Sequence, residues 1–358
     1  MNEKRFINRT RIIRLAAAFA AVAGLIAFGF LYKDKWNPNG DADPQKSDGT
    51  LFAMDTYMSF AAYGENADEA IEEAKQLIEE CERKWSVTDA QSEIGKLNEE
   101  GFLEPSEETL ELIKLALSYS KYTNGCFDPA IYPLVRAWGF TTGENRVPPQ
   151  SEIDALLPYA DARNVILDGD TVRLQEGMSL DLGGIAKGRA GDEVLALFKG
   201  KGIKSALISL GGNVQTLGHK PDGNDWKIGI HSPYGNEIIA VVGVSDRCVI
   251  TSGAYERYFT AEDGTVYGHI ISPFDGYPVS NDLSSVTVIA GSGALGDALS
   301  TALFVMGAES AIEFWKANEG FEIILLSKDG TLYVSEGILP SFEARTSSAV
   351  NSVCEIKR

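Results

Sequence analysis

The sequence has little of the side chains on which most metal and thiol chemistry depends. Its 358 residues include three histidines, at positions 219, 231 and 269, and four cysteines. No HExxH pattern or Cys/His cluster is present, which disfavours a zinc hydrolase. The cysteines, at positions 81, 126, 248 and 354, have no CxxC or other ligand spacing, so we expect scattered structural thiols.

The glycine-rich stretch of the sequence matches neither of the familiar loops that bind phosphate. Residues 179–198, SLDLGGIAKGRAGDEVLALF, contain glycines and a lysine, but Lys187 precedes Gly188, whereas a Walker loop needs GK followed by Ser or Thr. The dinucleotide fingerprint GxGxxG is also absent from this stretch. Ser252 and Ser272 lack a GxSxG context, so a serine hydrolase gains little support.

Basic residues are scarce outside one segment. The chain has 32 Lys and Arg against 51 Asp and Glu, a formal net charge of -19. A nucleic-acid partner would need a local basic patch, and the sequence has none beyond its first fourteen residues. We therefore expect no nucleic-acid partner.

The amino-terminal segment combines bases with an apolar run. Five basic residues within the first fourteen precede an uncharged stretch at 15–32, long enough to span a bilayer. The apolar run continues past the small residues of a possible signal-peptidase site, which favours an uncleaved signal-anchor over a cleaved signal peptide. The prediction is a cell-membrane protein with its amino end in the cytoplasm and the domain that follows on the extracytoplasmic side.

The rest of the chain predicts one α+β domain. Residues 33–50 form a polar linker, residues 51–345 carry the regular patterns, and residues 346–358 are a tail. The stretch 51–64 indicates a strand, and helices are indicated at 66–85, at 106–125 behind a capping-box pattern, and over ALGDALSTALFVMG. Helices followed by antiparallel-looking strands, without strict βαβ alternation, favour α+β over a doubly wound sheet.

The stretch at 179–198 predicts an anion site. If a helix begins near Gly184 and runs to Lys199, its first turn presents free N–H groups, with no side chains at the two glycines to block a ligand. Lys187 adds a positive charge there. Asp181 would repel a bare phosphate unless a cation or a neutral donor group of the ligand intervened. A Gly-Gly helix entry is also commonly structural.

A carboxylate and a hydroxyl are paired in GDALSTAL. Asp297 and Thr301 are four residues apart, so on a helix they project from one face. Hard oxygen ligands of this kind suit Mg²⁺, which binds few protein groups and completes its shell with phosphates and water. The alternative is that Asp297 only favours the positive end of the helix while Thr301 packs.

His269 is the histidine best placed for chemistry. It lies in YGHIISPFDGYPV, between an expected strand and a loop rich in Pro and Gly, where a general base could reach a ligand. A lone histidine is more often structural.

Together these segments resemble the ApbE family of FAD:protein FMN transferases. The resemblance covers most of residues 50–330. Its motifs, in the family order, are MDTYM (54–58), WSVTDAQSEIGKLN (85–98), CFDPAIYPLVRAWGF (126–140), DLGGIAKG (181–188), SLGGN (209–213), TSGAYERYF (251–259), HIISPFDGYPV (269–279) and GDALSTALFVMG (296–307).

The resemblance implies a magnesium-dependent enzyme that moves FMN from FAD to a Thr or Ser hydroxyl of an exported acceptor protein and releases AMP. It implies FAD contacts at Met54, Trp85, Phe127, Asp128, Asp181, Lys187 and Ile271. It places Mg²⁺ on the Gly184 carbonyl, Asp297 and Thr301, makes His269 the base that deprotonates the acceptor hydroxyl, and counts Asp181 as a second catalytic residue.

Three positions depart from the family pattern. Asp55 stands where Gly is most frequent, Ser272 where Asp or Asn is usual, and Asp275 where Thr or Ser is common. Two other functions stay open: a FAD pyrophosphatase, in which water replaces the protein hydroxyl, and a non-catalytic flavin-binding surface protein. The joint presence of Asp297, Thr301 and His269 favours catalysis.

Overall fold

The computed structural model describes residues 45–358. The expected basic segment and signal-anchor at 1–32 lie outside these residues. Among the helices of the described part, none combines the length and apolar character that crossing a bilayer requires.

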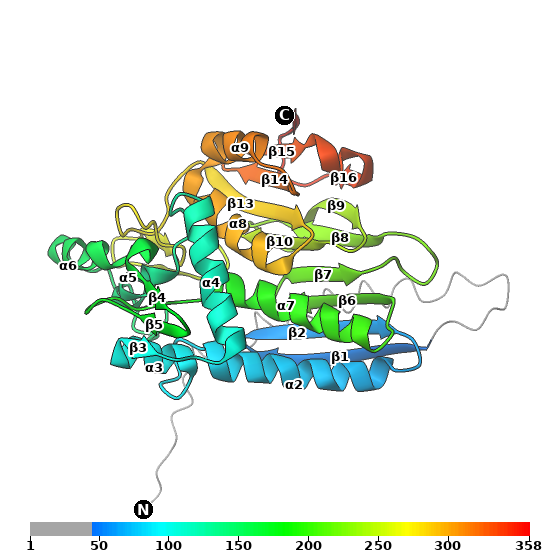
Figure 1. Ribbon diagram of the computed structural model, residues 1–358. Helices are drawn as coiled ribbons and strands as arrows, with labels where there is room; N and C mark the ends of the chain where they lie inside the picture. The colour runs from blue at the N-terminus through cyan, green and yellow to red at the C-terminus, as the bar shows by residue number, and fades with distance from the viewer. Residues whose placement is uncertain (1–44) are drawn as a thin grey trace, which may run out of the picture.

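A large sheet forms the centre of the molecule (Figure 1). Its strand order is β1-β2-β6-β7-β10-β13-β14-β15-β17. Neighbouring strands pair antiparallel except β15 and β17, which are parallel. The strands are β1 (Lys46–Ala53), β2 (Thr56–Tyr63), β6 (Ser205–Leu210), β7 (Asn213–Leu217), β10 (Cys248–Ser252), β13 (Leu283–Ala290), β14 (Phe321–Ser327), β15 (Thr331–Ser335) and β17 (Ser352–Ile356). This antiparallel pairing agrees with the α+β prediction.

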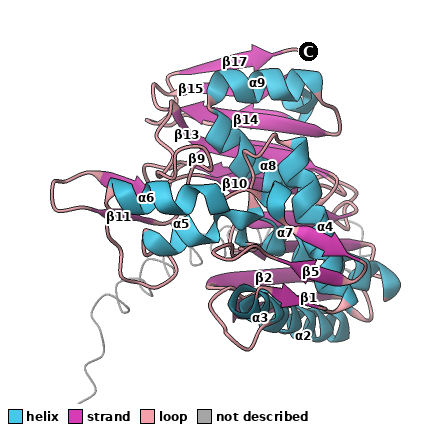
Figure 2. Cartoon of the chain, turned by 60° about the vertical axis from the view of Figure 1, so that its left-hand side comes forward, coloured by secondary structure: helices cyan, strands magenta, loops and turns pink. Residues whose placement is uncertain are grey.

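Helices cover one face of this sheet, and a smaller sheet covers the other (Figures 1 and 2). The helices of this layer are α2 (Ala67–Trp85), α3 (Glu93–Glu100), α4 (Glu107–Tyr122), α7 (Gly183–Gly200), α8 (Gly293–Met306) and α9 (Ala308–Ala317). Helices α5 (Tyr132–Ala137) and α6 (Gln150–Leu156) form a separate apolar cluster at one end of the molecule (Figure 2). The small sheet has the order β16-β9-β8, formed by Phe342–Ala344, Ile238–Val244 and Trp226–His231.

Two further small sheets lie near one end of the molecule. One is the hairpin of β11 (Tyr258–Thr260) and β12 (Val266–Gly268); the other has the order β3-β5-β4, from Phe102–Leu103, Thr171–Arg173 and Ile166–Asp168. The hairpin packs the rings of Phe259 and Tyr267 against Trp138, whose ring centroid lies 5.0 Å from that of Tyr267. This aromatic cluster fixes the chain that leads into His269.

The expected strand at 51–64 is a hairpin of two strands. Met54 and Asp55 form a two-residue turn between β1 and β2, and both have positive φ, 49° and 59°. Positive φ at both central residues is the type I′ geometry that matches the twist of an antiparallel pair. The prediction of a single strand was wrong because the turn carries neither Asn-Gly nor Asp-Gly.

The domain extends beyond both expected boundaries. Strand β1 begins at Lys46, inside the segment expected to be a linker, and β17 at Ser352–Ile356 adds a parallel strand from the expected tail. The helix expected at 106–125 ends at Tyr122, and the Ser106 hydroxyl bonds Glu93 and Thr109 instead of capping the helix backbone. Strand β1 pairs with the adjacent β2, whereas β17 depends on pairing with the non-adjacent β15, which local patterns do not reveal.

Close packing of α7 on α8 positions the central site. A Cβ on Gly188 would lie 2.2 Å from the Gly293 carbonyl oxygen, so only glycine allows this approach. Asp192 of α7 accepts hydrogen bonds from the Ser292 hydroxyl and from the backbone N–H groups of Gly293 and Ala294, and thereby caps α8. The first two turns of α8 are therefore held against α7.

Candidate active site

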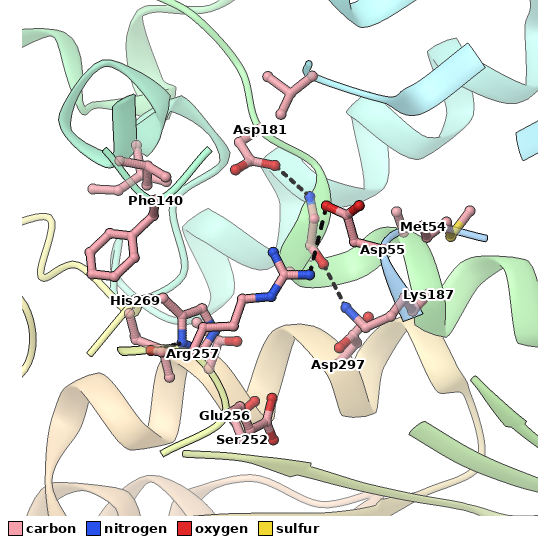
Figure 3. Close-up of a pocket in the computed structure, with 18 of the residues that line it drawn as sticks. Met54, Asp55, Phe140, Asp181, Lys187, Ser252, Glu256, Arg257, His269 and Asp297 are labelled. Atoms are coloured by element: carbon pink, nitrogen blue, oxygen red, sulfur yellow. Dashed lines mark hydrogen bonds and ion pairs between the residues drawn. The ribbon is translucent and has the colours of Figure 1, made fainter. Parts of the chain in front are cut away.

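One cavity of about 630 Å³ brings together every residue that the sequence predicted for the site (Figure 3). Its volume is in the usual range for a site that binds a small ligand or cofactor. The predicted residues that line it are Met54, Trp85, Phe127, Asp128, Asp181, Gly184, Lys187, His269, Ile271, Asp297 and Thr301. They come from the β1–β2 turn, the end of α2, the loop before α5, the start of α7, the loop after β12, and α8.

The start of α7 forms one wall of the cavity. Asp181 precedes the helix, and its Oδ1 accepts a hydrogen bond of 2.8 Å from the Gly183 N–H. Burial raises the pKa of Asp181, while this N–H and the Lys187 charge act in the opposite direction. The Lys187 ammonium donates to the Gly183 carbonyl at 3.2 Å. A ligand at this helix entry therefore meets a carboxylate and an ammonium, in addition to the glycine backbone.

The three groups predicted to hold a metal meet where α7 and α8 touch. The Gly188 N–H, which in a regular α-helix donates to the Gly184 carbonyl, donates to Asp297 Oδ2 at 2.9 Å. A Cβ built on Gly184 would lie 3.8 Å from Thr301 Oγ1, so these two residues are neighbours. Burial raises the pKa of Asp297. Asp192 caps the backbone N–H groups at the start of α8, so Asp297 is not needed as the cap.

These donors fit a hard divalent cation. Within the described residues, no group of three or more His, Cys, Asp or Glu side chains is arranged to hold a metal ion. One carboxylate, one hydroxyl and one carbonyl are the oxygen donors that Mg²⁺ prefers, and so few protein ligands leave room for water and phosphate. No described residue donates a hydrogen bond to Asp297 Oδ1.

His269 is held in the form that a general base requires. Its backbone N–H and its Nδ1 both lie within hydrogen-bonding distance of the Arg257 carbonyl, at 3.0 and 3.2 Å. Because a carbonyl only accepts, Nδ1 carries the proton and Nε2 of the neutral ring is left as an acceptor. Burial, and then the Arg257 charge, lower the pKa of His269 to about 4. The ring is therefore neutral near pH 7.

Apolar side chains form another part of the cavity lining. Phe127 and Trp85 are almost fully buried and present only part of their rings to the cavity. Met54 holds its turn in place by donating its N–H to Glu82 at 2.8 Å. The Asp128 carboxylate is occupied by the Ala130 and Ala162 N–H groups, so its side chain stabilises the loop and leaves ligand contact to the neighbouring backbone.

The positions that depart from the family pattern are accommodated locally. Asp55 adopts the positive φ of the turn, which Asp tolerates better than most residues. After His269, the Ser272 hydroxyl accepts from the Phe274 N–H, and the Asp275 carboxylate accepts from the Tyr277 N–H at 3.0 Å. Both side chains stabilise the turn that follows His269, so neither substitution disturbs the base.

The sequence did not reveal several polar groups of the cavity. Arg257 and Glu256 come from TSGAYERYF, which carries no catalytic spacing, and Arg257 points into the centre of the cavity (Figure 3). Desolvation inside the cavity, and the charge of Asp297, raise the pKa of Glu256 to about 7. Asn213 is buried, and its Nδ2 has no hydrogen-bond partner.

Comparison with known proteins identifies the family. Residues 54–325 match the model of the ApbE family. A FAD:protein FMN transferase of Klebsiella pneumoniae (strain 342) is 35% identical over 268 residues, which cover 73% of this chain and 83% of that protein. The chain belongs to the ApbE family. As a member of it, the chain is an enzyme of the flavin-transferase class.

Other ApbE proteins agree with this assignment over most of their length. The FAD:protein FMN transferase of Treponema pallidum (strain Nichols) is 33% identical over 312 residues, or 81% of this chain and 85% of that protein. The crystal structure of the ApbE protein of Thermotoga maritima has a TM-score of 0.79 at 32% identity, covering 84% of this chain and all of that one. The apo flavinyl transferase ApbE of Pseudomonas stutzeri has a TM-score of 0.74 at 27% identity, covering 86% and 97%.

Proposed function

We propose that this ApbE-family chain transfers FMN from FAD to a Thr or Ser hydroxyl of an exported acceptor protein, with Mg²⁺ as cofactor and AMP as the second product. The observation that carries the proposal is the meeting, in one cavity, of a neutral His269 with the first turn of α7 and the Asp297 carboxylate. A base, an anion-binding helix entry and a hard oxygen donor are the groups that transfer of a phosphoryl ester requires.

Each step uses a group with a defined position. The acceptor hydroxyl oxygen attacks the phosphorus of the FMN half, and its proton passes to Nε2 of His269. The bond between that phosphorus and the bridging oxygen breaks, and AMP leaves with the electron pair. The charge on the nonbridging oxygens is met by the Gly184 N–H and by Lys187. The Gly183 and Ile185 N–H groups already have protein acceptors.

Gly184, Asp297 and Thr301 are the residues that would hold Mg²⁺. When bound, the ion supplies Lewis acidity and neutralises phosphate charge. The cavity lining supports the need for a cation because its carboxylates outnumber its fixed cations. The carboxylates are Asp55, Glu82, Asp128, Asp181, Glu256 and Asp297, against Lys187 and Arg257.

We also propose that the segment at 1–32 anchors the enzyme in the cell membrane, with the catalytic domain on the extracytoplasmic side. The support is the basic flank followed by an uncharged run. Membrane association that persists in washed vesicles, and its loss when this segment is removed, would test this placement. A soluble full chain would contradict it.

Covalent labelling distinguishes transfer from hydrolysis. The chain is incubated with FAD, Mg²⁺ and a candidate exported acceptor, and the products are separated on a denaturing gel. Flavin fluorescence that stays with the acceptor band supports transfer. Free FMN and AMP without labelled protein would favour the pyrophosphatase, and unchanged FAD would contradict both enzymatic functions.

A further inference from the structure

The cavity contains two permanently charged cations, and the predicted FAD contacts include only one of them. Lys187 belongs to the predicted contacts, whereas Arg257 does not. Figure 3 shows Arg257 extending toward Asp55 and the start of α7, with its guanidinium between them. It therefore lies on the side of the cavity that faces the helix entry.

Arg257 is poorly satisfied by the protein. Its guanidinium lies 4.0 Å from Asp55 Oδ2, and none of the described residues accepts a hydrogen bond from it. A guanidinium has five N–H donors in a planar fork that matches phosphate. An ion pair of this length between exposed groups contributes only about 0–1 kcal/mol, so a phosphate can replace it at little cost.

The backbone of Arg257 is fixed even though its side chain is weakly paired. Its carbonyl accepts from both the N–H and the Nδ1 of His269. The next residues form the β11–β12 hairpin, which packs on Trp138. The backbone of Arg257 is therefore held in place beside His269, whichever anion the guanidinium contacts.

We propose that Arg257 releases Asp55 and binds the pyrophosphate of FAD through its guanidinium fork, opposite Lys187, while Asp55 competes with the ligand for Arg257. The proposal rests on the proposed function, since it names a further binding residue for the same substrate. Asp55 then weakens binding of the substrate in this chain, because its side chain is 81% exposed at the cavity and carries a charge of the same sign as phosphate.

Equilibrium binding to the full chain tests the proposal with two probes. The probes are FAD and riboflavin, which has the flavin but no phosphate, titrated with Mg²⁺ omitted so that FAD is not consumed. Arg257→Ala should raise the Kd for FAD about 10- to 100-fold, the value of hydrogen bonds to a charged group, and leave the Kd for riboflavin unchanged. Arg257→Lys keeps the charge without the fork and should recover part of the loss.

Asp55→Asn gives a result of opposite sign. Asparagine keeps the turn because it tolerates positive φ, but it removes the competing charge. The Kd for FAD should fall about two- to fivefold, with riboflavin unchanged. Arg345→Ala is the matched control, because Arg345 is 49% exposed and paired with Glu343 at 3.1 Å outside the cavity.

Three results would overturn the inference: equal loss of FAD and riboflavin affinity in Arg257→Ala, no loss of either, or weaker FAD binding in Asp55→Asn. The same samples separate this inference from the proposed function. FAD binding without FMN transfer by the wild type contradicts the function alone. Transfer by the wild type with unchanged FAD affinity in Arg257→Ala contradicts the inference alone, and a wild type that binds no FAD contradicts both.

Discussion

Replacing Asp297 by asparagine separates its role in the site from its role in the fold. The carboxylate is buried on α8 and accepts a hydrogen bond from the Gly188 N–H of α7. An asparagine side chain at this position would keep an oxygen for that N–H, and it would remove a buried negative charge that nothing but a cation or Lys187 balances. We therefore expect Asp297→Asn to fold at least as stably as the wild type and to lose FMN transfer.

The alanine variant sets the scale of the structural effect. Asp297→Ala leaves the Gly188 N–H without its acceptor, which costs about 1–3 kcal/mol relative to Asp297→Asn. For a domain of this size, each kcal/mol corresponds to roughly 1.5 °C in Tm. The alanine variant should therefore melt about 2–5 °C below the asparagine variant, while both are inactive.

Thermal unfolding with and without Mg²⁺ completes the test. In the presence of FAD, Mg²⁺ at about 100 times its Kd should stabilise the wild type by about 2.7 kcal/mol, or roughly 4 °C. Neither variant should show this shift. Full transfer activity in Asp297→Asn, or a shift with Mg²⁺ equal to that of the wild type, would refute the assignment of Asp297 as a metal ligand.

Three further expectations concern the pH dependence of activity, the packing of α7 on α8, and Asn213 in the cavity lining. The kcat/KM profile should keep its acid limb well below pH 6.5, because the pKa of His269 is lowered to about 4. Between pH 6.5 and 4 the unfolded chain binds a proton at this residue and the folded chain does not. The stability linked to His269 is therefore complete above pH 6.5 and is lost as the pH falls toward 4. A limb at pH 6.5 would contradict the burial of His269. Gly188→Ala should destabilise by about 1–3 kcal/mol or more in chemical denaturation, since its Cβ meets the Gly293 carbonyl, whereas Gly200→Ala in the same helix has open space and should not destabilise. Asn213→Ala should destabilise by about 1 kcal/mol, because it removes the hydrogen bond from Gln215 Nε2 to Asn213 Oδ1. It should also weaken FAD binding, because the buried Nδ2 has no protein acceptor and is free to donate to a ligand. Unchanged FAD affinity would count against a ligand contact.

Much of the fold could be predicted from local patterns. The helices found at Ala67–Trp85, Gly183–Gly200 and Gly293–Met306 follow apolar spacing and helix-start signals that act within a few residues. The site residues could be placed because Asp297 and Thr301 share a helix face and because the motifs of a known family identify the rest. The cavity contains all of them.

The remainder depends on contacts between distant segments. Strand β17 gains its place only by pairing with β15, and Asp192 caps a helix that begins a hundred residues later. No local pattern marks either relation. Arg257 and Asn213 line the cavity through tertiary packing, and their unpaired donors become visible only when the surrounding acceptors are known.

Intact-mass spectrometry of the acceptor protein tests the central proposal most directly. After incubation with the enzyme, FAD and Mg²⁺, we expect the acceptor to gain the mass of one FMN less one water, with one AMP released for each modified acceptor. His269→Ala and Asp297→Asn should abolish the gain, and replacing the modified Thr or Ser of the acceptor by Val should do the same. An acceptor of unchanged mass in the presence of free FMN and AMP would contradict the proposed transfer.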